Sequence, residues 1–275
     1  MIKSSLIKKI LLTPVVLFAA FYLVGVYIVQ TDERIVETRD NSQLMRETVA
    51  LFGASGTTGD GILKATLASS EIEHIYVITR RITARMEEGV KRGKVTVIKH
   101  MDYLNYDTII TQLADIDTVY WAIGISSIGV DEKTYGMIHT DFPMAFLQAW
   151  HKQGTSEQRS FHFISSSDIS EDSDTMWVRE KIRAEKALFG FADSSALKVI
   201  AYRPDYIGPT EEEAHIGQDM LYWFFAPVGA AVRAQQIGQA MIEISARIDS
   251  YANGDKLSTR NIIRHSDAYV RFISR

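Results

Sequence analysis

The sequence predicts an α/β fold, in which a parallel sheet is covered by helices on both faces, preceded by one membrane-spanning helix. Three observations predict it: an uncharged apolar run near the N-terminus, a glycine-rich turn between a short apolar run and a helical period, and further short apolar runs that alternate with helical stretches. A chain of 275 residues is long enough for one domain of catalytic size.

The N-terminal run, residues 10–30, carries no charged side chain and follows a short basic stretch, residues 1–9, that contains Lys3, Lys8 and Lys9. Roughly twenty helical residues at ~1.5 Å each match the ~30 Å hydrocarbon core of a bilayer. We therefore expect residues 10–30 to be an uncleaved transmembrane anchor. A cleaved signal peptide is the closest alternative, but the run is long for one and no small-x-small site follows it. A buried helix is seldom apolar all round.

The side of the membrane is harder to predict. Arg34 and Arg39 follow the apolar run and are mixed with acidic residues, so the positive-inside rule weakly favours a cytoplasmic N-terminus and an exported body. A nicotinamide cofactor drawn from the cytosol would require the opposite. We expect a single-pass membrane protein whose soluble domain faces the cytosol, with this conflict left open. Residues 31–47 are mostly polar and are expected to be a linker.

A strand, a glycine turn and a helix start follow the linker. Val49–Phe52 form an apolar run fit for a buried strand, and a helical period begins at Ile62. Between them, one glycine would permit the tight turn, one would let the backbone approach a pyrophosphate, and one would let the helix pack on the strand. The helix N-terminus supplies N–H donors to the phosphates. This pattern predicts a Rossmann-type domain, whose expected cofactor contacts here are Gly53, Ser55, Gly56, Thr57, Thr58 and Gly59.

The second apolar run, residues 72–81, ends about twenty residues beyond the last glycine, where an acid that binds the ribose is expected. The sequence has Thr79, Arg80 and Arg81 there instead. Guanidinium groups suit a 2′-phosphate, whereas a carboxylate would repel it. We therefore expect NADP(H) as the cofactor, with NAD(H) as the alternative. The arginines could also be two solvated side chains after a strand, without a role in binding.

Four more apolar runs, residues 95–107, 117–127, 161–167 and 197–204, predict the remaining strands of a parallel sheet. Ligands of such sheets lie beyond the carboxyl ends of the strands. The further cofactor contacts expected at this rim are Asp102 at the adenine edge, Ala122, Gly124, Arg203 and Pro204.

The segments GASGTTG, AIG, SSS and AYRPDYIGP occur in an order that resembles the extended or atypical short-chain dehydrogenase/reductases. The sequence is most similar there to Tat-interacting-protein-like oxidoreductases and other NAD(P)-binding epimerase/dehydratase-like proteins. The resemblance covers residues 48–275 and implies an NAD(P)-binding Rossmann domain with a small C-terminal portion on the substrate side. It implies oxidoreductase chemistry on a carbonyl or alcohol but does not fix the small-molecule substrate.

The resemblance also implies three catalytic positions. They are a serine after the fifth strand, which is Ser166, a tyrosine, and a lysine four residues later that binds the ribose, which is Lys181. Trp177 stands at the tyrosine position, and an indole N–H cannot cycle a proton near neutral pH. Another acid could serve, with Tyr135, Tyr206 or a water as candidates, or a shifted register could supply a different residue. Otherwise the protein would bind NADP(H) without turnover, as a sensor or scaffold with a protein partner at a membrane.

Other features narrow the function classes. The charge balance is slightly acidic with no basic run, so nucleic acid is not an expected partner. The chain has no cysteine and its histidines are scattered, so no metal site is expected. The acidic run 211–213 is expected to be a solvated loop. The aromatic stretch 219–229 could help cover a substrate or contact the bilayer, but we favour ordinary core.

Overall fold

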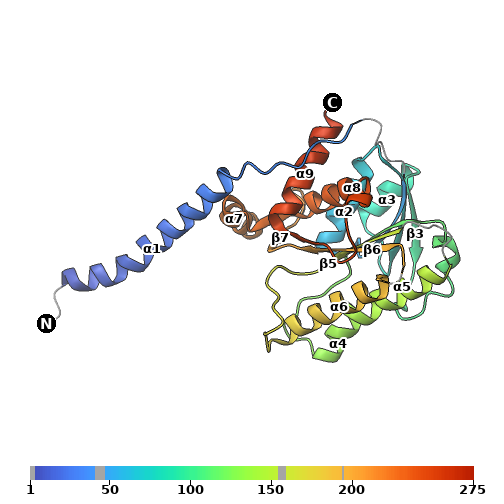
Figure 1. Cartoon of the computed structure of the whole chain (residues 1–275), viewed down its shortest axis with the longest axis horizontal. Coiled ribbons are helices and arrows are strands. Elements are labelled where there is room, and N and C mark those ends of the chain that lie inside the picture. The colour runs from blue at the N-terminus through green and yellow to red at the C-terminus, as the bar shows by residue number, and fades with distance from the viewer. Residues whose placement is uncertain (1–3, 41–46, 154–158, 194) are drawn as a thin grey trace.

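The computed structural model describes residues 4–40, 47–153, 159–193 and 195–275 (Figure 1). Within these residues a seven-stranded parallel sheet has the order β3-β2-β1-β4-β5-β6-β9. Its strands are β1 (Glu47–Phe52), β2 (Ile72–Thr79), β3 (Val95–Lys99), β4 (Thr118–Trp121), β5 (Arg159–Ile164), β6 (Leu197–Arg203) and β9 (Lys256–Ser258). The six expected strands and the Rossmann-type α/β architecture are confirmed, while the short edge strand β9 was not anticipated.

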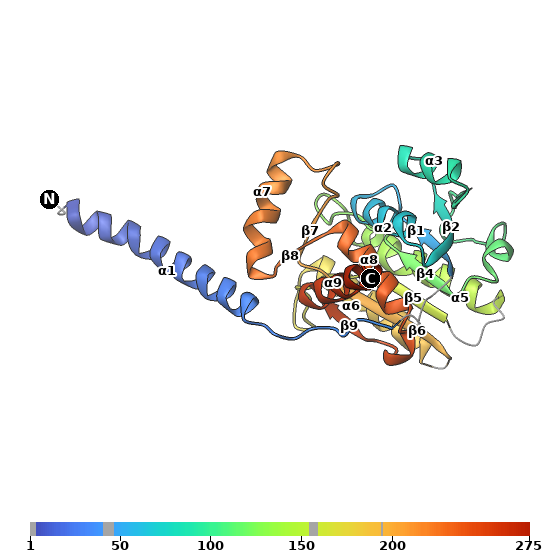
Figure 2. The same cartoon turned by 90° about the horizontal axis from the view of Figure 1, so that it is seen from above.

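Helices cover both faces of the sheet (Figures 1 and 2). In β1, Val49 and Leu51 face one hydrophobic core, and Ala50 and Phe52 face the other. This alternation buries the strand on both faces, as parallel sheets require. One face is covered by α2 (Thr57–Ala68), α3 (Ala84–Lys91), α8 (Ala234–Ser245) and α9 (Thr259–Ile273), and the other by η2 (Ile110–Leu113), α5 (Phe142–Gln153) and α6 (Met176–Ala192). Shorter helical segments are α4 (Glu132–Gly136), the π-helix η3 (Met137–Asp141) and η5 (Ile248–Ser250).

A small second unit follows β6. Strand β7 (Tyr206–Gly208) pairs in parallel with β8 (Ala231–Arg233), and the connection between them contains α7 (Ile216–Phe225) and the turn η4 (Ala226–Val228). None of the residues of α7 is buried. The expectation that the aromatic stretch is ordinary core is therefore wrong, because this helix packs beside the domain rather than within it.

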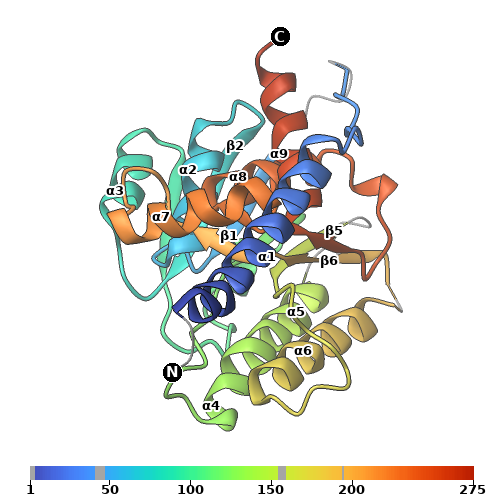
Figure 3. The same cartoon turned by 90° about the vertical axis from the view of Figure 1, so that its left-hand side faces the viewer.

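The N-terminal helix α1 (Ser4–Gln30) projects away from the domain (Figures 1, 2 and 3). Among the described residues it is the one helix long and apolar enough to cross a membrane, over Thr13–Gln30, and none of that segment is buried. A signal sequence would meet the same criteria of length and composition.

The polar segment after α1 is attached to the domain. Arg39 is 2% exposed, and its guanidinium donates hydrogen bonds to Glu71 at 2.7 Å and to Glu243 at 2.9 Å. The guanidinium also lies 4.2 Å from the ring centroid of Phe272 in α9. A buried charge needs such partners because burial without them is costly. The expected linker, residues 31–47, therefore contains one residue in fixed contact with the core.

Candidate dinucleotide-binding and active site

The glycine loop joins β1 to α2 and is shaped by close approaches of the backbone. Gly53 has φ +79°, and a Cβ built there would lie 2.5 Å from the carbonyl carbon of Ala122 at the end of β4. A Cβ on Gly59 would overlap the Gly53 carbonyl group. By contrast, a Cβ on Gly56 would meet no atom closer than 3.5 Å. The fold therefore requires glycine at positions 53 and 59. Gly56 borders open space, where a ligand can come close to the protein backbone.

Helix α2 begins at Thr57 directly after this loop, and Gly56 occupies its N-cap without a capping side chain. The N–H groups of the first helical turn have no partner within a helix and attract anions, aided by the helix dipole. A pyrophosphate at this position would be bound by backbone groups alone. The loop and helix therefore fit a dinucleotide through backbone geometry.

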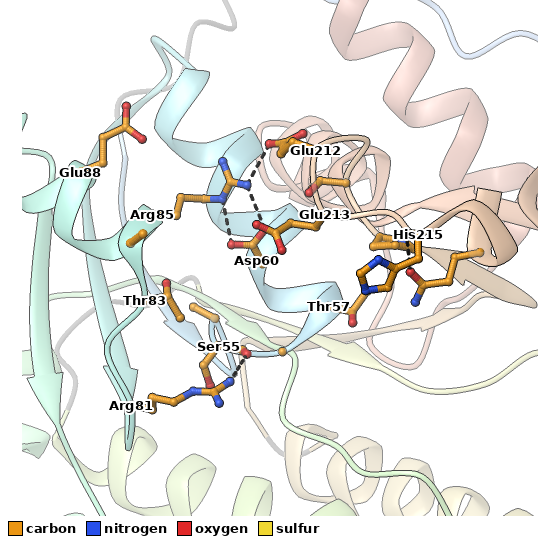
Figure 4. A pocket seen from close by; sticks show the side chains of 16 residues that line it. Ser55, Thr57, Asp60, Arg81, Thr83, Arg85, Glu88, Glu212, Glu213 and His215 are labelled. Atoms are coloured by element: carbon orange, nitrogen blue, oxygen red, sulfur yellow. Dashed lines mark hydrogen bonds and ion pairs between the residues drawn. The ribbon is translucent and has the colours of Figure 1, made fainter.

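A cavity of about 580 Å³ extends from the loop toward β2 and α3 (Figure 4). Ser55, Gly56 and Thr57 line one side, and Arg81 lies at the end of β2 with its guanidinium donating to the Ser55 carbonyl oxygen at 3.0 Å. Arg81 is one of the two arginines that the sequence placed at the ribose position, and it lines this cavity. A guanidinium there can pair with a phosphate on the adenosine ribose.

The other two groups predicted for the adenosine end lie elsewhere. The Arg80 guanidinium lies 5.7 Å from the ring centroid of Tyr103, and the Asp102 carboxylate accepts a hydrogen bond from the Leu104 N–H at 3.0 Å. Neither side chain lines the cavity around the glycine loop. Their roles in cofactor binding stay predictions.

The acidic loop after β7 closes one side of the same cavity. Glu212 accepts hydrogen bonds from Lys64 at 2.6 Å and from Arg85 at 2.9 Å, while Arg85 also donates to Asp60 at 2.8 Å (Figure 4). Partial burial raises the pKa of Glu212, but the hydrogen bonds from Lys64 and Arg85 outweigh it and lower the pKa to about 2. Residues 211–213 are exposed, as expected of a solvated loop, and the ion pairs of Glu212 fasten this loop to α2 and α3.

A second cavity, of about 310 Å³, shares Gly56 and Thr57 with the first and continues toward β4, β5 and α6. Its lining includes Thr58, the predicted contacts Ala122 and Gly124 at the tip of β4, and Lys181. We refer to the two cavities together as the groove. The sequence-predicted loop, the β4 tip and Lys181 thus lie along one groove, in the order that a dinucleotide would need.

Lys181 is the buried cation of this groove. It is 7% exposed, and its Nζ donates to the Ile164 carbonyl oxygen at 3.2 Å and lies 5.6 Å from the ring centroid of Phe163. Burial lowers the pKa of Lys181 to about 8, although the nearby Glu185 carboxylate acts in the opposite direction. An ammonium with a pKa near neutrality can give up and regain a proton, and such groups gather at functional sites.

His139, in the π-helix η3, is the other titratable group that lines the second cavity. Its imidazole lies against Tyr135 with ring centroids 4.2 Å apart and ring planes tilted by 38°, and its Nδ1 is buried without a hydrogen-bond partner. Burial and the charge of Lys181 lower the pKa of His139 to about 3, so the ring is neutral. Sequence reasoning missed this residue, because no local spacing links it to Lys181.

The remaining predicted catalytic residues do not line either cavity. Ser166 and Trp177 are half-buried, the latter in the first turn of α6. Tyr135 is buried, and burial raises its pKa to about 12, whereas the Tyr206 hydroxyl donates to the Gln218 carbonyl oxygen at 3.4 Å. Their roles in catalysis stay predictions.

The last predicted cofactor contacts, Arg203 and Pro204, belong to a structural cluster at the end of β6. The Glu185 carboxylate accepts hydrogen bonds from Arg203 Nε at 2.9 Å and from the Ser165 hydroxyl at 2.6 Å. The Pro204 carbonyl oxygen accepts from the Ser167 N–H at 3.2 Å. Glu185 therefore ties β5, β6 and α6 together beneath the groove, and a direct role of Arg203 and Pro204 in binding stays a prediction.

The sheet and the glycine loop define a Rossmann-type α/β fold, and comparisons with solved structures show which proteins share it. No family model matches the chain, and no curated protein matches it. The solved structures that it resembles include short-chain dehydrogenase/reductases, so the resemblance inferred from the sequence is confirmed for the fold. No comparison supports the narrower Tat-interacting-protein-like assignment, which stays a prediction.

Three of these structures illustrate the likeness. A 3-oxoacyl-[acyl-carrier protein] reductase from Brucella melitensis is 17% identical with a TM-score of 0.61, over 79% of this chain and 97% of its own. A short-chain dehydrogenase/reductase from Serratia marcescens is 14% identical with a TM-score of 0.61, over 80% and 99%. BdcA in complex with NADPH is 13% identical with a TM-score of 0.62, over 79% and 95%. Identities at this level establish a common fold and leave the activity to be argued from the site.

Proposed function

We propose that the protein is a membrane-anchored oxidoreductase that uses NADP(H) to interconvert a carbonyl and an alcohol. The observation that supports it best is the groove itself, which leads from the open backbone at Gly56 to the buried ammonium of Lys181. NADP(H) would supply or accept the hydride there. In the reducing direction the substrate carbonyl oxygen takes the proton from Lys181, which then regains one from water.

Different residues of the groove would bind different parts of the cofactor. Backbone N–H groups at the start of α2 bind the pyrophosphate, and Arg81 pairs with the 2′-phosphate, which favours NADP(H) over NAD(H). His139, neutral and adjacent to Lys181, keeps that end of the groove free of a second positive charge. Because this cofactor is cytosolic, we place the domain on the cytosolic side of the membrane.

The experiment that tests the proposal is calorimetric titration of the purified full chain in detergent with NADPH, NADP⁺, NADH and NAD⁺. The matched control is Gly56→Ala, whose added methyl group fills the open space at the loop without meeting any atom closer than 3.5 Å. We expect the phosphorylated pair to bind more tightly and the variant to lose binding while remaining folded. A folded wild type that binds none of the four would overturn the proposal.

A second function has one specific observation in its favour. Trp177 replaces the expected tyrosine, and no tyrosine hydroxyl lines the groove among the described residues. A cofactor-binding sensor or scaffold at a membrane would bind NADP(H) tightly and transfer no hydride to a broad panel of carbonyls and alcohols. Tight binding together with complete absence of turnover would select this function over the oxidoreductase.

A further inference from the structure

Helix α7 exposes a continuous apolar face. Ile216, Met220 and Trp223 are 80%, 63% and 63% exposed, and their spacing of four and three residues aligns them along one side of the helix. Leu221 and Phe224 add further exposed apolar surface. Side chains of this size, gathered on a helix without a single buried residue, indicate a surface that is covered in the working protein.

The C-terminal end of this helix and the turn η4 that follows it contact α1. The Tyr22 hydroxyl donates to the Phe224 carbonyl oxygen at 2.9 Å, and the Phe224 ring stacks on Tyr22 and on Phe18, with centroids 5.3 and 6.2 Å apart. A Cβ added to Gly25 would lie 3.1 Å from the side chain of Val228 in η4. These contacts run along the C-terminal half of α1 and join α7 to it.

This contact fixes the depth of α7. Phe18 lies twelve residues before Gln30, the last residue of α1, which is about 18 Å along the helix axis. The part of α1 that touches α7 therefore lies within the apolar segment Thr13–Gln30 and not beyond its end. A bilayer that takes up this segment must also take up the C-terminal end of α7 at Phe224.

Basic groups gather at the point where α1 ends. Arg34, Arg260 and Arg264 surround the single carboxylate of Asp32, with Arg34 at 2.8 Å and Arg260 at 3.8 Å. The hydrogen bonds from Arg34 and the charges of Arg264 and Arg34 hold the pKa of Asp32 well below its usual range. The cavity beside them also contains Asp267, so a positive excess remains. Arg34 has 73% of its side chain exposed. Guanidinium groups at this level suit the phosphates of lipid headgroups.

We propose that α7 is an interfacial helix whose Ile216, Met220 and Trp223 side chains insert into the bilayer beside α1, while the arginines around Asp32 meet anionic headgroups. Tryptophan and tyrosine favour this boundary because their rings are apolar and their N–H or O–H groups reach water. The proposal rests on the membrane anchor within the proposed function. It does not depend on NADP(H) binding or on turnover.

The chain contains no cysteine, so single-cysteine variants can be labelled at one position only. The full chain is reconstituted into phosphatidylcholine and phosphatidylserine vesicles, with an environment-sensitive fluorophore on Met220→Cys or Ile216→Cys. The matched control is Met101→Cys, an equally apolar residue that is 71% exposed and follows β3, at the edge of the sheet far from α1 (Figure 1). All three positions are exposed, so the substitutions leave the core intact.

We expect the labels at positions 216 and 220 to emit at shorter wavelength and to be quenched several-fold more by lipids carrying a nitroxide on the acyl chain than the label at position 101. Equal quenching at all three positions would overturn the proposal, and a protein that covers α7 would then be the alternative occupant. Release of the chain by alkaline carbonate would overturn the anchor and this proposal together. NADPH titration in the same vesicles tests the proposed function separately from the interfacial helix. Quenching without nucleotide binding would contradict the oxidoreductase and support the interfacial helix.

Discussion

The two ends of the groove are built on different principles. At the dinucleotide end, the positions that matter most are backbone positions, because Gly53 and Gly59 have no room for a side chain and Gly56 leaves space for a ligand. At the other end, the chemistry depends on the few side chains that line the second cavity, of which only Lys181 and His139 titrate. A backbone shape is maintained by the whole fold, whereas one catalytic side chain can change without disturbing the structure.

The largest effect is expected at Gly59. In Gly59→Ala the new methyl group overlaps the Gly53 carbonyl, so the loop must deform and the free energy of unfolding should fall by about 3 kcal/mol. Gly56→Ala has no such clash and should unfold as wild type does, losing only cofactor affinity. Urea unfolding followed by circular dichroism compares the two. If both variants were equally destabilised, the distinction between fold-required and ligand-facing glycines would be lost.

Lys181 tests the other end of the groove. Lys181→Met should lower the rate of carbonyl reduction about 100-fold or more, because the proton donor is removed. In wild type, the protonated form is lost as the pH rises through the pKa of about 8, so reduction should slow above that pH while alcohol oxidation should quicken.

The control for this variant is Lys186→Met on the same helix, whose ammonium is exposed and pairs with Glu171 at 3.0 Å. It should keep the wild-type rate and pH profile. A Lys181→Met enzyme with an unchanged pH profile would show that the proton comes from elsewhere.

Arg81 is expected to give a moderate effect confined to one cofactor. Arg81→Ala should weaken NADPH binding about tenfold, the value of one charge-assisted contact, and leave NADH binding nearly unchanged. Arg80→Ala, whose guanidinium lies over Tyr103, should change the preference less. Fluorescence titration with both reduced cofactors measures the ratio. Equal losses for NADPH and NADH would indicate that Arg81 supports the loop and does not contact the 2′-phosphate.

Trp177 is expected to give the smallest effect. Its side chain does not line the groove, so Trp177→Tyr should change turnover by less than about threefold, because general acid catalysis needs a group within hydrogen-bond reach. Steady-state rates at several pH values measure this. A hundredfold gain in turnover would show that position 177 is still placed to act on the reacting atoms. The catalytic end of the groove would then differ from an active one by a single substitution.

The parts of the structure that repeat a local pattern could be predicted from the sequence. Six strands, the glycine loop and the cavity position of Arg81 follow from apolar runs and glycine spacing. The position of Gly124 at the β4 tip follows from the rule that ligands lie beyond the carboxyl ends of parallel strands, whereas Lys181, which lines the same cavity, was expected from the family resemblance.

The rest depends on contacts between distant segments. His139 reaches the groove because η3 packs beside α6, and Glu185 binds Ser165 and Arg203 from a third element. The apolar side chains of α7 are of the kind found in a core helix. Only the tertiary structure, in which α7 lies at the surface with its C-terminal end against α1, shows that they are not buried. Composition alone cannot distinguish an exposed apolar helix from a buried one, because tertiary packing decides which side chains are buried.

The ion pairs of Arg39 have a consequence for how the protein moves. Because Arg39 is fixed between Glu71 and Glu243, only eight residues connect the end of α1 at Gln30 to a rigid point in the core. Fully extended, they span at most about 28 Å. If α1 anchors the protein in a membrane as proposed, this short connection restricts the height and tilt of the domain above the bilayer and confines its encounters to a thin layer next to the membrane.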